Sequence, residues 1–270
     1  SLWTKARKRF FRHKLAMVGL SILVLLILIS AFASILTPYS PTAQDLRAIR
    51  KPPTVAHLLG TDGVGRDIAS RILHAGQISL SVGLVSVSIS MLVGILIGVI
   101  AGYAGGKTDL VLMRLTDMVM TFPSLVVIIT VSAAIGPSVY NAMLVIGLLS
   151  WPSIARLVRS QFLSLREQQF VQAARSIGVS NWNIAFKHIF PNTISSITVA
   201  VTFGVASAIL MEASLSFLGL GVQPPTPSWG NMLRDAQSLN ILEEMPWIWL
   251  PPGIMIALAV LSINFIGDGL

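Results

Sequence analysis

One stretch of the sequence is similar to a nucleotide-binding motif: Gly105, Gly106, Lys107 and Thr108 match the end of a phosphate-binding P-loop. The complete pattern also needs a glycine at position 101, where this chain has Ala101. A P-loop lies between a β-strand and a helix, whereas this stretch follows a long apolar run. We therefore predict a short cytoplasmic turn here, and no ATP or other cofactor bound by this chain.

The other residues capable of chemistry are scattered. Residues 60–67 are rich in glycine and charge, but they lack the alternating oxygen ligands of a calcium loop and predict a structured outer turn. The four histidines do not pair at metal-ligand spacing, and no Gly-x-Ser-x-Gly motif occurs. The acids nearest to the apolar runs are Asp117, Glu212 and Asp268, and no two share a segment. An enzyme with its active site inside a membrane is therefore only weakly supported by these residues.

The composition indicates a protein that crosses a membrane several times. Of the 270 residues, 54% are hydrophobic and 11% are charged, whereas an average soluble domain is about 25% charged. The chain has no cysteine, which excludes a disulfide-stapled domain. Its formal net charge is +8, but the basic residues flank apolar runs and form no face interleaved with aromatics. We predict contact with membrane lipid and no nucleic-acid partner.

Six apolar runs approach the length of about 20 residues that a membrane-spanning helix needs. They cover residues 15–36, 75–106, 118–135, 138–155, 192–211 and 245–267. Pro123 and Pro152 fall inside the third and fourth runs and predict kinks. The first run could be a signal peptide, but its 22 residues exceed the 7–15 of such a segment and favour a retained anchor.

These runs divide the chain into four parts. They are a basic segment at 1–14, a first transmembrane helix at 15–36, an extracytoplasmic loop at 37–77, and a five-helix core at 78–270 with a cytoplasmic loop at 161–191. Thirteen of the nineteen Lys and Arg residues lie in segments 1–14, 107–114 and 156–190. Basic residues collect on the cytoplasmic side, so both termini are predicted to be cytoplasmic.

Small residues recur at every fourth position of the second run, namely Ser86, Ser90, Gly94, Gly98 and Gly102. This spacing keeps them on one face of a helix. Small side chains let two helix backbones approach closely within a membrane. The pattern predicts a tight helix–helix seam.

Two acids beside the apolar runs could line a pathway through the membrane or stabilise the structure. Asp117 follows Arg114 by three residues, which predicts a local ion pair on one helix face. Glu212 follows about 20 uncharged residues, which carry a straight helix about 30 Å. We therefore expect Glu212 near the outer face, as a hydrogen-bonded acid at a helix end, with a buried proton relay as the alternative.

The loop between the fourth and fifth runs carries structure of its own. Helix-forming residues extend from Glu167 to Ile177, and Gly178 can adopt the left-handed conformation that ends a helix. Ser180 can cap a second short helix, and Pro191 is expected to open the fifth span. The loop thus predicts two short helices whose small alanines form a surface that a partner can approach closely.

The same loop resembles the "EAA" loop of ABC-importer permeases, Glu-Ala-Ala followed at fixed spacing by Gly and then Pro. Gln172, Ala173, Ala174, Gly178 and Pro191 keep this spacing, although glutamine replaces the glutamate. Further stretches are similar to the dipeptide, oligopeptide and nickel branch of that family, and most like the "C" permease of a peptide importer. They are residues 57–62, 65–67, 212–221, 223–227, 229–230 and 264–270.

This resemblance implies an all-α polytopic membrane protein with six transmembrane helices and the architecture of type I ABC importer permeases (MetI-like). It implies a bacterial inner-membrane permease that pairs with a homologous second permease and forms half of a peptide pathway. Two cytoplasmic ATPases would bind ATP and Mg and hold the coupling residues, and an extracytoplasmic binding protein would deliver the cargo. Nickel chelates, glutathione or another small solute are alternative cargoes, and a secondary transporter is a further alternative class.

Overall fold

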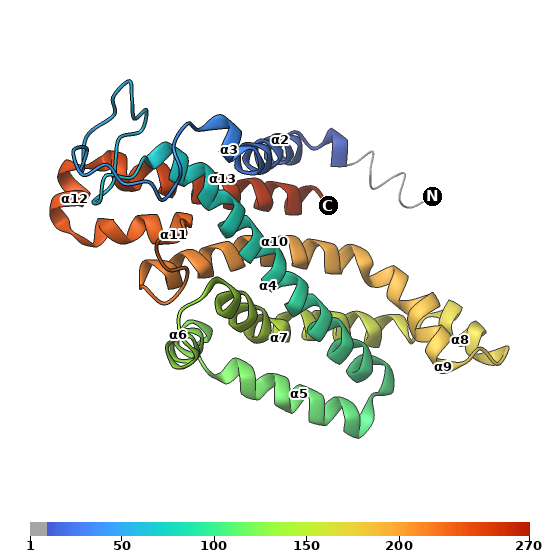
Figure 1. The fold of residues 1–270 in the computed structure, drawn as a ribbon. Helices are drawn as coiled ribbons and strands as arrows, with labels where there is room; N and C mark the ends of the chain where they lie inside the picture. The colour runs from blue at the N-terminus through green and yellow to red at the C-terminus, as the bar shows by residue number, and fades with distance from the viewer. Residues whose placement is uncertain (1–9) are drawn as a thin grey trace.

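The computed structural model describes residues 10–270, and its regular elements are helices (Figure 1). Within this range five helices are long and apolar enough to cross a membrane. They are α2 (Lys14–Ala31), α4 (Ile68–Ala104), α7 (Val139–Leu165), the continuous helix Asn181–Phe217 and α13 (Pro246–Gly269). Helices α5 (Gly106–Thr121) and α6 (Ser124–Ile135) form a sixth, bent candidate span. The predicted all-α, six-span fold is confirmed.

The bend between α5 and α6 is sharper than a kink. The two helices meet at 81°, and the chain leaves the helix at Phe122 and Pro123. Proline has no N–H to continue the helical hydrogen bonds, and it disfavours a helical conformation in the residue before it. Pro152, by contrast, lies inside α7, which continues unbroken for 27 residues.

The fifth span does not begin at Pro191 as expected. Short α9 (Asn181–Asn183), the π-helix η1 (Ile184–Ile189) and α10 (Phe190–Phe217) form one continuous helix, with Pro191 in the first turn of α10. A π-turn inserts an extra residue into the helical ladder and so adjusts the backbone bonds that a proline disturbs. The second short helix is therefore the start of the membrane helix.

Helix α4 lies at the centre of the molecule and packs against α7, α10 and α2 (Figure 1). Helices α2 and α13 pack as an antiparallel pair, with Gly269 beside Ala16 and Gly19 beside Ser262. Asp67 caps α4, because its Oδ2 accepts a hydrogen bond from the Ser70 N–H at 2.7 Å. The helix thus begins at Ile68, earlier than the apolar run at 75–106.

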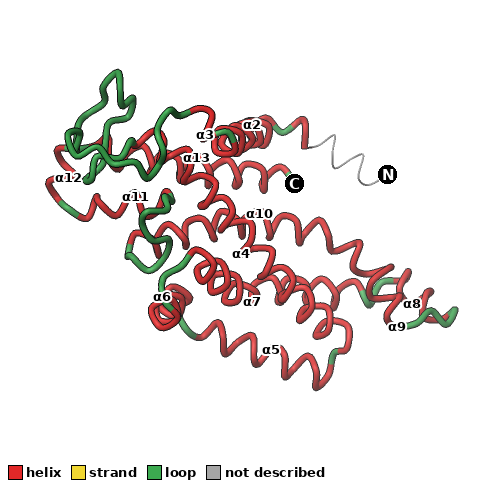
Figure 2. Tube along the Cα trace, viewed as in Figure 1, coloured by secondary structure: helices red, strands yellow, loops and turns green. Residues whose placement is uncertain are grey.

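The remaining elements gather at the two ends of the helices. Loops around α3 (Ala33–Leu36), α11 (Trp229–Met232), η2 (Leu233–Gln237) and α12 (Leu239–Glu244) lie at one end (Figure 2). Helix α8 (Gln169–Ser176) and α9 lie at the opposite end (Figure 1). The hydrophobic core is divided into three clusters of buried side chains between these ends.

Candidate functional sites

Helix α8 forms a protruding corner on a buried base. Val171 is fully buried and Ala174 is 6% exposed, and both pack into the cluster that includes Ile184 and Ile189 of η1. Ala173 on the neighbouring face is exposed. The expectation that both alanines face a partner is therefore wrong for Ala174, because one face of so short a helix must pack onto the protein itself.

The turn after α8 exposes large apolar side chains. Gly178 has φ of 80°, and a Cβ at this position would meet no atom within 4 Å. Ser180 Oγ accepts a hydrogen bond from the Asn183 N–H, which caps α9. Ile177 is 80% exposed and Trp182 is 71% exposed. Since exposed large apolar groups in a cluster mark interaction surfaces, this corner can bind another protein.

Gln172 turns toward its own chain. Its Nε2 donates a hydrogen bond to the Glu167 carbonyl at 3.2 Å, and the side chain remains exposed. An amide at this position carries no charge, so it offers a partner hydrogen bonds without an ion pair.

The small-residue ridge of α4 lies against α7. A Cβ on Gly94 would lie 2.7 Å from Ile154 Cβ, and one on Gly98 would lie 2.6 Å from the Ala155 carbonyl oxygen. A Cβ on Gly102 would lie 2.6 Å from Phe162 Cβ. These distances are shorter than real Cβ contacts, so the two backbones approach as closely as they do only because glycine occupies all three positions.

Two ion pairs connect α5 to α7. Both carboxylate oxygens of Asp109 accept from the Arg159 guanidinium, at 2.5 and 2.6 Å. Asp117 pairs with Arg156 at 2.5 Å. The expected pair of Asp117 with Arg114 is wrong, because the helix packing presents a basic side chain from α7 that the spacing within α5 could not reveal.

Glu212 is fully buried in α10 inside a cage of serines. Its two carboxylate oxygens accept hydrogen bonds from Ser79 Oγ at 3.1 Å and Ser216 Oγ at 2.7 Å. Each serine in turn accepts from a backbone N–H of the segment that links α10 to α13, Ser79 from Trp229 at 3.1 Å and Ser216 from Val222 at 2.9 Å. Glu212 is thus hydrogen-bonded as expected, although α10 continues beyond it to Phe217.

A cavity of about 610 Å³ lies where α4, α7 and α10 meet the break between α5 and α6. Its lining holds no charged residue. Six serines contribute to it: Ser86, Ser90, Ser124, Ser150, Ser153 and Ser207. The spacing of small residues predicted a packing role for Ser86 and Ser90. The other four serines could not be identified from the sequence, since isolated serines in apolar helices give no pattern.

The residues that the structure describes contain no group of three His, Cys, Asp or Glu side chains that could hold a metal ion. Gly105 and Gly106 form the turn between α4 and α5, with φ of 65° and 54°, and α5 begins at Gly106. That arrangement places two membrane helices, with no strand, around the stretch that resembles a P-loop.

The sequence of the chain matches two protein-family models. Residues 94–270 match the binding-protein-dependent transport system inner membrane component. The chain belongs to this family. Residues 1–53 also match the N-terminal transmembrane domain of oligopeptide transport permease C. The protein is therefore a multi-pass membrane permease subunit of an ABC transporter and not its catalytic subunit.

Named relatives of the permease cover nearly its whole length. It is 44% identical over 266 residues to a candidate peptide permease of Brucella suis biovar 1, a match over 98% of this chain and 88% of the relative. It is 42% identical over 270 residues to a dipeptide transport system permease protein of Alkalihalophilus pseudofirmus, a match over 100% of this chain and 88% of the relative. A glutathione transport system permease protein of Pectobacterium atrosepticum is 39% identical over 269 residues, a match over 99% of this chain and 89% of the relative.

The fold of the permease is similar to a solved structure of the MetNI methionine ABC transporter in an inward-facing conformation. The TM-score is 0.58 at 16% identity, over 73% of the permease and 93% of that chain. At this identity the likeness concerns the fold, and it supports the type I importer architecture.

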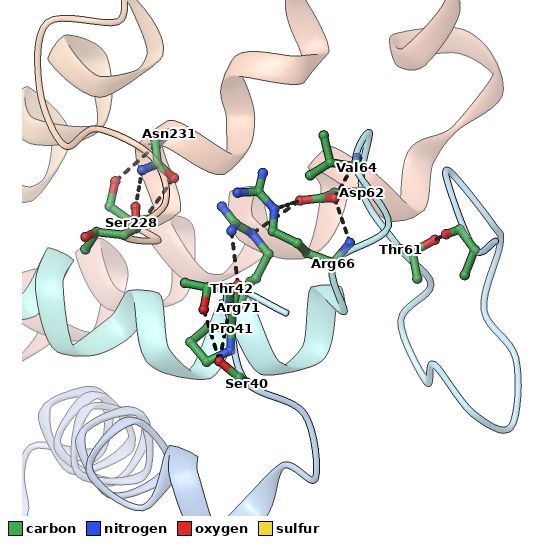
Figure 3. A network of polar contacts seen from close by, with 12 residues as sticks. Ser40, Pro41, Thr42, Thr61, Asp62, Val64, Arg66, Arg71, Ser228 and Asn231 are labelled. Atoms are coloured by element: carbon green, nitrogen blue, oxygen red, sulfur yellow. Dashed lines mark hydrogen bonds and ion pairs between the residues drawn. The ribbon is translucent and has the colours of Figure 1, made fainter. Parts of the chain in front are cut away.

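The glycine-rich turn of the permease at residues 60–67 is built around a buried acid (Figure 3). Asp62 Oδ1 accepts from the backbone N–H groups of Val64 at 3.0 Å and Arg66 at 2.9 Å. Its Oδ2 pairs with Arg66 Nε at 2.7 Å and with Arg71 Nε at 3.5 Å. Arg71 is only 3% exposed and also donates to the Pro41 carbonyl. No sequence pattern identifies this arginine, which ties Pro41 and Asp62 to the start of α4.

Proposed function

We propose that the permease is the membrane subunit of an ATP-driven peptide importer and forms half of the translocation pathway beside a homologous second permease. Two cytoplasmic ATPases, which bind ATP and Mg, dock at the corner formed by α8 and α9. An extracytoplasmic binding protein delivers cargo to the end that carries residues 37–67 and α11 to α12. The permease lies in the bacterial inner membrane with both termini in the cytoplasm.

The observation that supports docking of the ATPases is the exposed apolar corner at Ile177 and Trp182. This corner rests on the buried base of Val171 and Ala174. A rigid corner can transmit a push from a partner into η1 and α10, since the π-helix joins them without a break. The exposed surface of this corner is supplied by Gln172, Ala173 and Gly178. Pro191 lies in the first turn of α10, the helix that movement of the corner would displace.

Peptides are the proposed cargo because the named relatives include a dipeptide permease and a candidate peptide permease. Glutathione is the second candidate, favoured by the glutathione permease relative. Nickel chelates remain a further alternative.

The docking role is tested by Ala173→Trp and Gly178→Val, in permease reconstituted with its ATPases and binding protein. Tryptophan on the exposed face of α8 blocks a close approach, and a β-branched residue at φ of 80° is strained. We expect normal membrane levels, sharply reduced dipeptide uptake, and ATP hydrolysis that the loaded binding protein no longer stimulates.

Two variants control for local strain. Gly178→Asn should retain activity, because asparagine tolerates the left-handed conformation. Gly136→Val introduces backbone strain at the other end of the molecule, where φ is 90° and ψ is 148° and no atom lies within 4 Å of a Cβ, and it should leave ATPase binding intact. Wild-type uptake and stimulated hydrolysis in both test variants would remove the ATPase contact from this corner. Uptake by permease that never copurifies with an ATPase would favour a secondary transporter.

A further inference from the structure

A second cavity, of about 270 Å³, lies at the end of the molecule where α4 and α13 begin. Charged side chains make up half of its lining, namely Asp62, Arg66, Arg71, Arg234 and Asp235. We propose that this cavity binds the headgroup of a phospholipid, whose phosphate the arginines hold and whose ammonium group Asp235 holds. This lipid site is separate from the transport role proposed above and does not depend on it.

The arginines of this cavity have N–H groups to spare. Asp62 Oδ2 accepts from Arg66 Nε at 2.7 Å and lies 3.5 Å from Arg71 Nε, so one carboxylate serves two guanidinium groups (Figure 3). Arg71 is only 3% exposed, yet its Nη2 donates no hydrogen bond to any group of residues 10–270. Buried polar groups nearly always have a partner, and a guanidinium has five N–H donors. Arg71 therefore presents an unmatched donor to the cavity that it lines.

Arg234 adds a third guanidinium group to the lining. Its side chain is exposed, and it takes part in no ion pair within the described part of the chain. Three arginines against two aspartates give the lining a net charge of +1. Guanidinium groups bind phosphate oxygens through pairs of parallel N–H···O bonds. The lining therefore attracts an oxyanion.

The position of the cavity favours the phosphate of a lipid over a soluble anion. Its lining includes Ile68, the first residue of α4, and Ile248 in the first turn of α13. Both helices are long and apolar enough to cross a membrane, so their first turns are expected at the level of the lipid headgroups. Trp247 and Trp249 lie in the same turn of α13, and tryptophan is enriched at that level.

Asp235 gives the site a preference among phospholipids. Its carboxylate lies within electrostatic range of Arg66 and Arg71 but forms no ion pair with either of them. An acid in this position repels a simple anion, whereas an ammonium group beside the phosphate pairs with it. Phosphatidylethanolamine carries such an ammonium group, and phosphatidylglycerol does not. We therefore expect the ethanolamine lipid to bind more tightly.

Native mass spectrometry measures this binding on the complex of the permease with its partner subunits, stripped of lipid in detergent. The probes are phosphatidylethanolamine, phosphatidylglycerol and diacylglycerol with the same acyl chains. One saturable site should bind phosphatidylethanolamine about fivefold more tightly than phosphatidylglycerol, which is the effect of one further hydrogen bond. Diacylglycerol lacks the phosphate and should not bind at this site.

Two variants separate the two parts of the headgroup. Arg234→Gln removes a cation from the lining and should weaken the binding of both phospholipids about fivefold. Asp235→Asn should make the two phospholipids bind equally. Both side chains are exposed, so the thermal midpoints of the lipid-free complexes should equal that of the wild type. Arg47→Gln is the matched control, because Arg47 is an exposed arginine that does not line the cavity, and it should change neither affinity.

Three results would overturn the proposal. Equal phospholipid affinities of the wild type and Arg234→Gln would place the bound lipid elsewhere. A preference for the ethanolamine lipid that persists in Asp235→Asn would remove the ammonium contact. Inorganic phosphate is the last probe. If it raises the thermal midpoint of the lipid-free wild type but not of Arg234→Gln, and neither phospholipid binds, the cavity takes free phosphate and not a headgroup.

Discussion

Replacement of Glu212 should loosen the segment that links α10 to α13 rather than change how uptake by the permease depends on an ion gradient. Its two oxygens hold the hydroxyls of Ser79 and Ser216, and these hydroxyls receive the backbone N–H groups of Trp229 and Val222. A glutamine has one acceptor oxygen and one donor nitrogen, so it replaces only one of the two interactions. Glu212→Gln should therefore destabilise the folded state by about 1 kcal/mol.

Alanine at the same position removes both acceptors. Two buried serine hydroxyls are then left without an acceptor, each at a cost of about 1–3 kcal/mol. The expected destabilisation is about 2–6 kcal/mol for Glu212→Ala. The free energy of unfolding should therefore fall from the wild type to the glutamine variant and again to the alanine variant. The loss should be concentrated at the two serines that hold the segment linking α10 to α13.

Hydrogen exchange of the Val222 and Trp229 amides measures this directly. When these amides exchange through local opening, glutamine should raise their exchange rate about fivefold and alanine about thirtyfold or more. Glu244→Ala is the control, because this acid is exposed at the end of α12 and should leave both rates unchanged. Equal exchange in the wild type and Glu212→Ala would refute the reasoning. A proton-dependent uptake that disappears in Glu212→Gln would instead assign this acid to a relay.

Three further predictions concern topology and packing. A cysteine replacing Thr54 should react with a membrane-impermeant thiol reagent from outside and one replacing Gln168 should not, and the reverse pattern would invert the orientation. Gly98→Ala should reduce the free energy of unfolding by about 1–3 kcal/mol and so lower the thermal midpoint, since its Cβ would meet the Ala155 carbonyl. Gly253→Ala, whose Cβ would have its nearest atom at 3.9 Å, should not lower it. Asp109→Asn removes the ion pair with Arg159 and should lower the thermal midpoint more than Glu167→Gln, which removes the exposed pair with Arg166. Equal thermal midpoints of the two variants would show that the Arg159 pair contributes nothing to stability.

The sequence predicted the features that depend on one helix alone. Apolar runs gave the spans, and the small-residue spacing gave one face of α4, because both follow from helical periodicity. The left-handed turn at Gly178 follows from the properties of glycine. These predictions require no knowledge of which helix packs against which.

The features that the sequence did not reveal depend on neighbours distant in the chain. Asp117 finds Arg156 rather than Arg114, and Ala174 is buried because η1 lies beneath it. The cavity serines come from four separate segments and share a wall only after folding. The π-turn before Pro191 adjusts the helix without interrupting it, so a proline that predicted a boundary lies within a continuous helix.

The length of α4 gives the permease a lever arm. Its 37 residues form a rod about 55 Å long. One end is clamped by the Asp67 cap and the Arg71 ion pair, and the other end is pressed by Gly102 against Phe162 of the cluster that supports α8. A rigid rod that tilts by about 5° displaces its far end by about 5 Å, given a rise of 1.5 Å per residue. A tilt of α4 therefore moves the end that carries Asp67 and the end that carries Gly102 together, although they lie on opposite sides of the molecule.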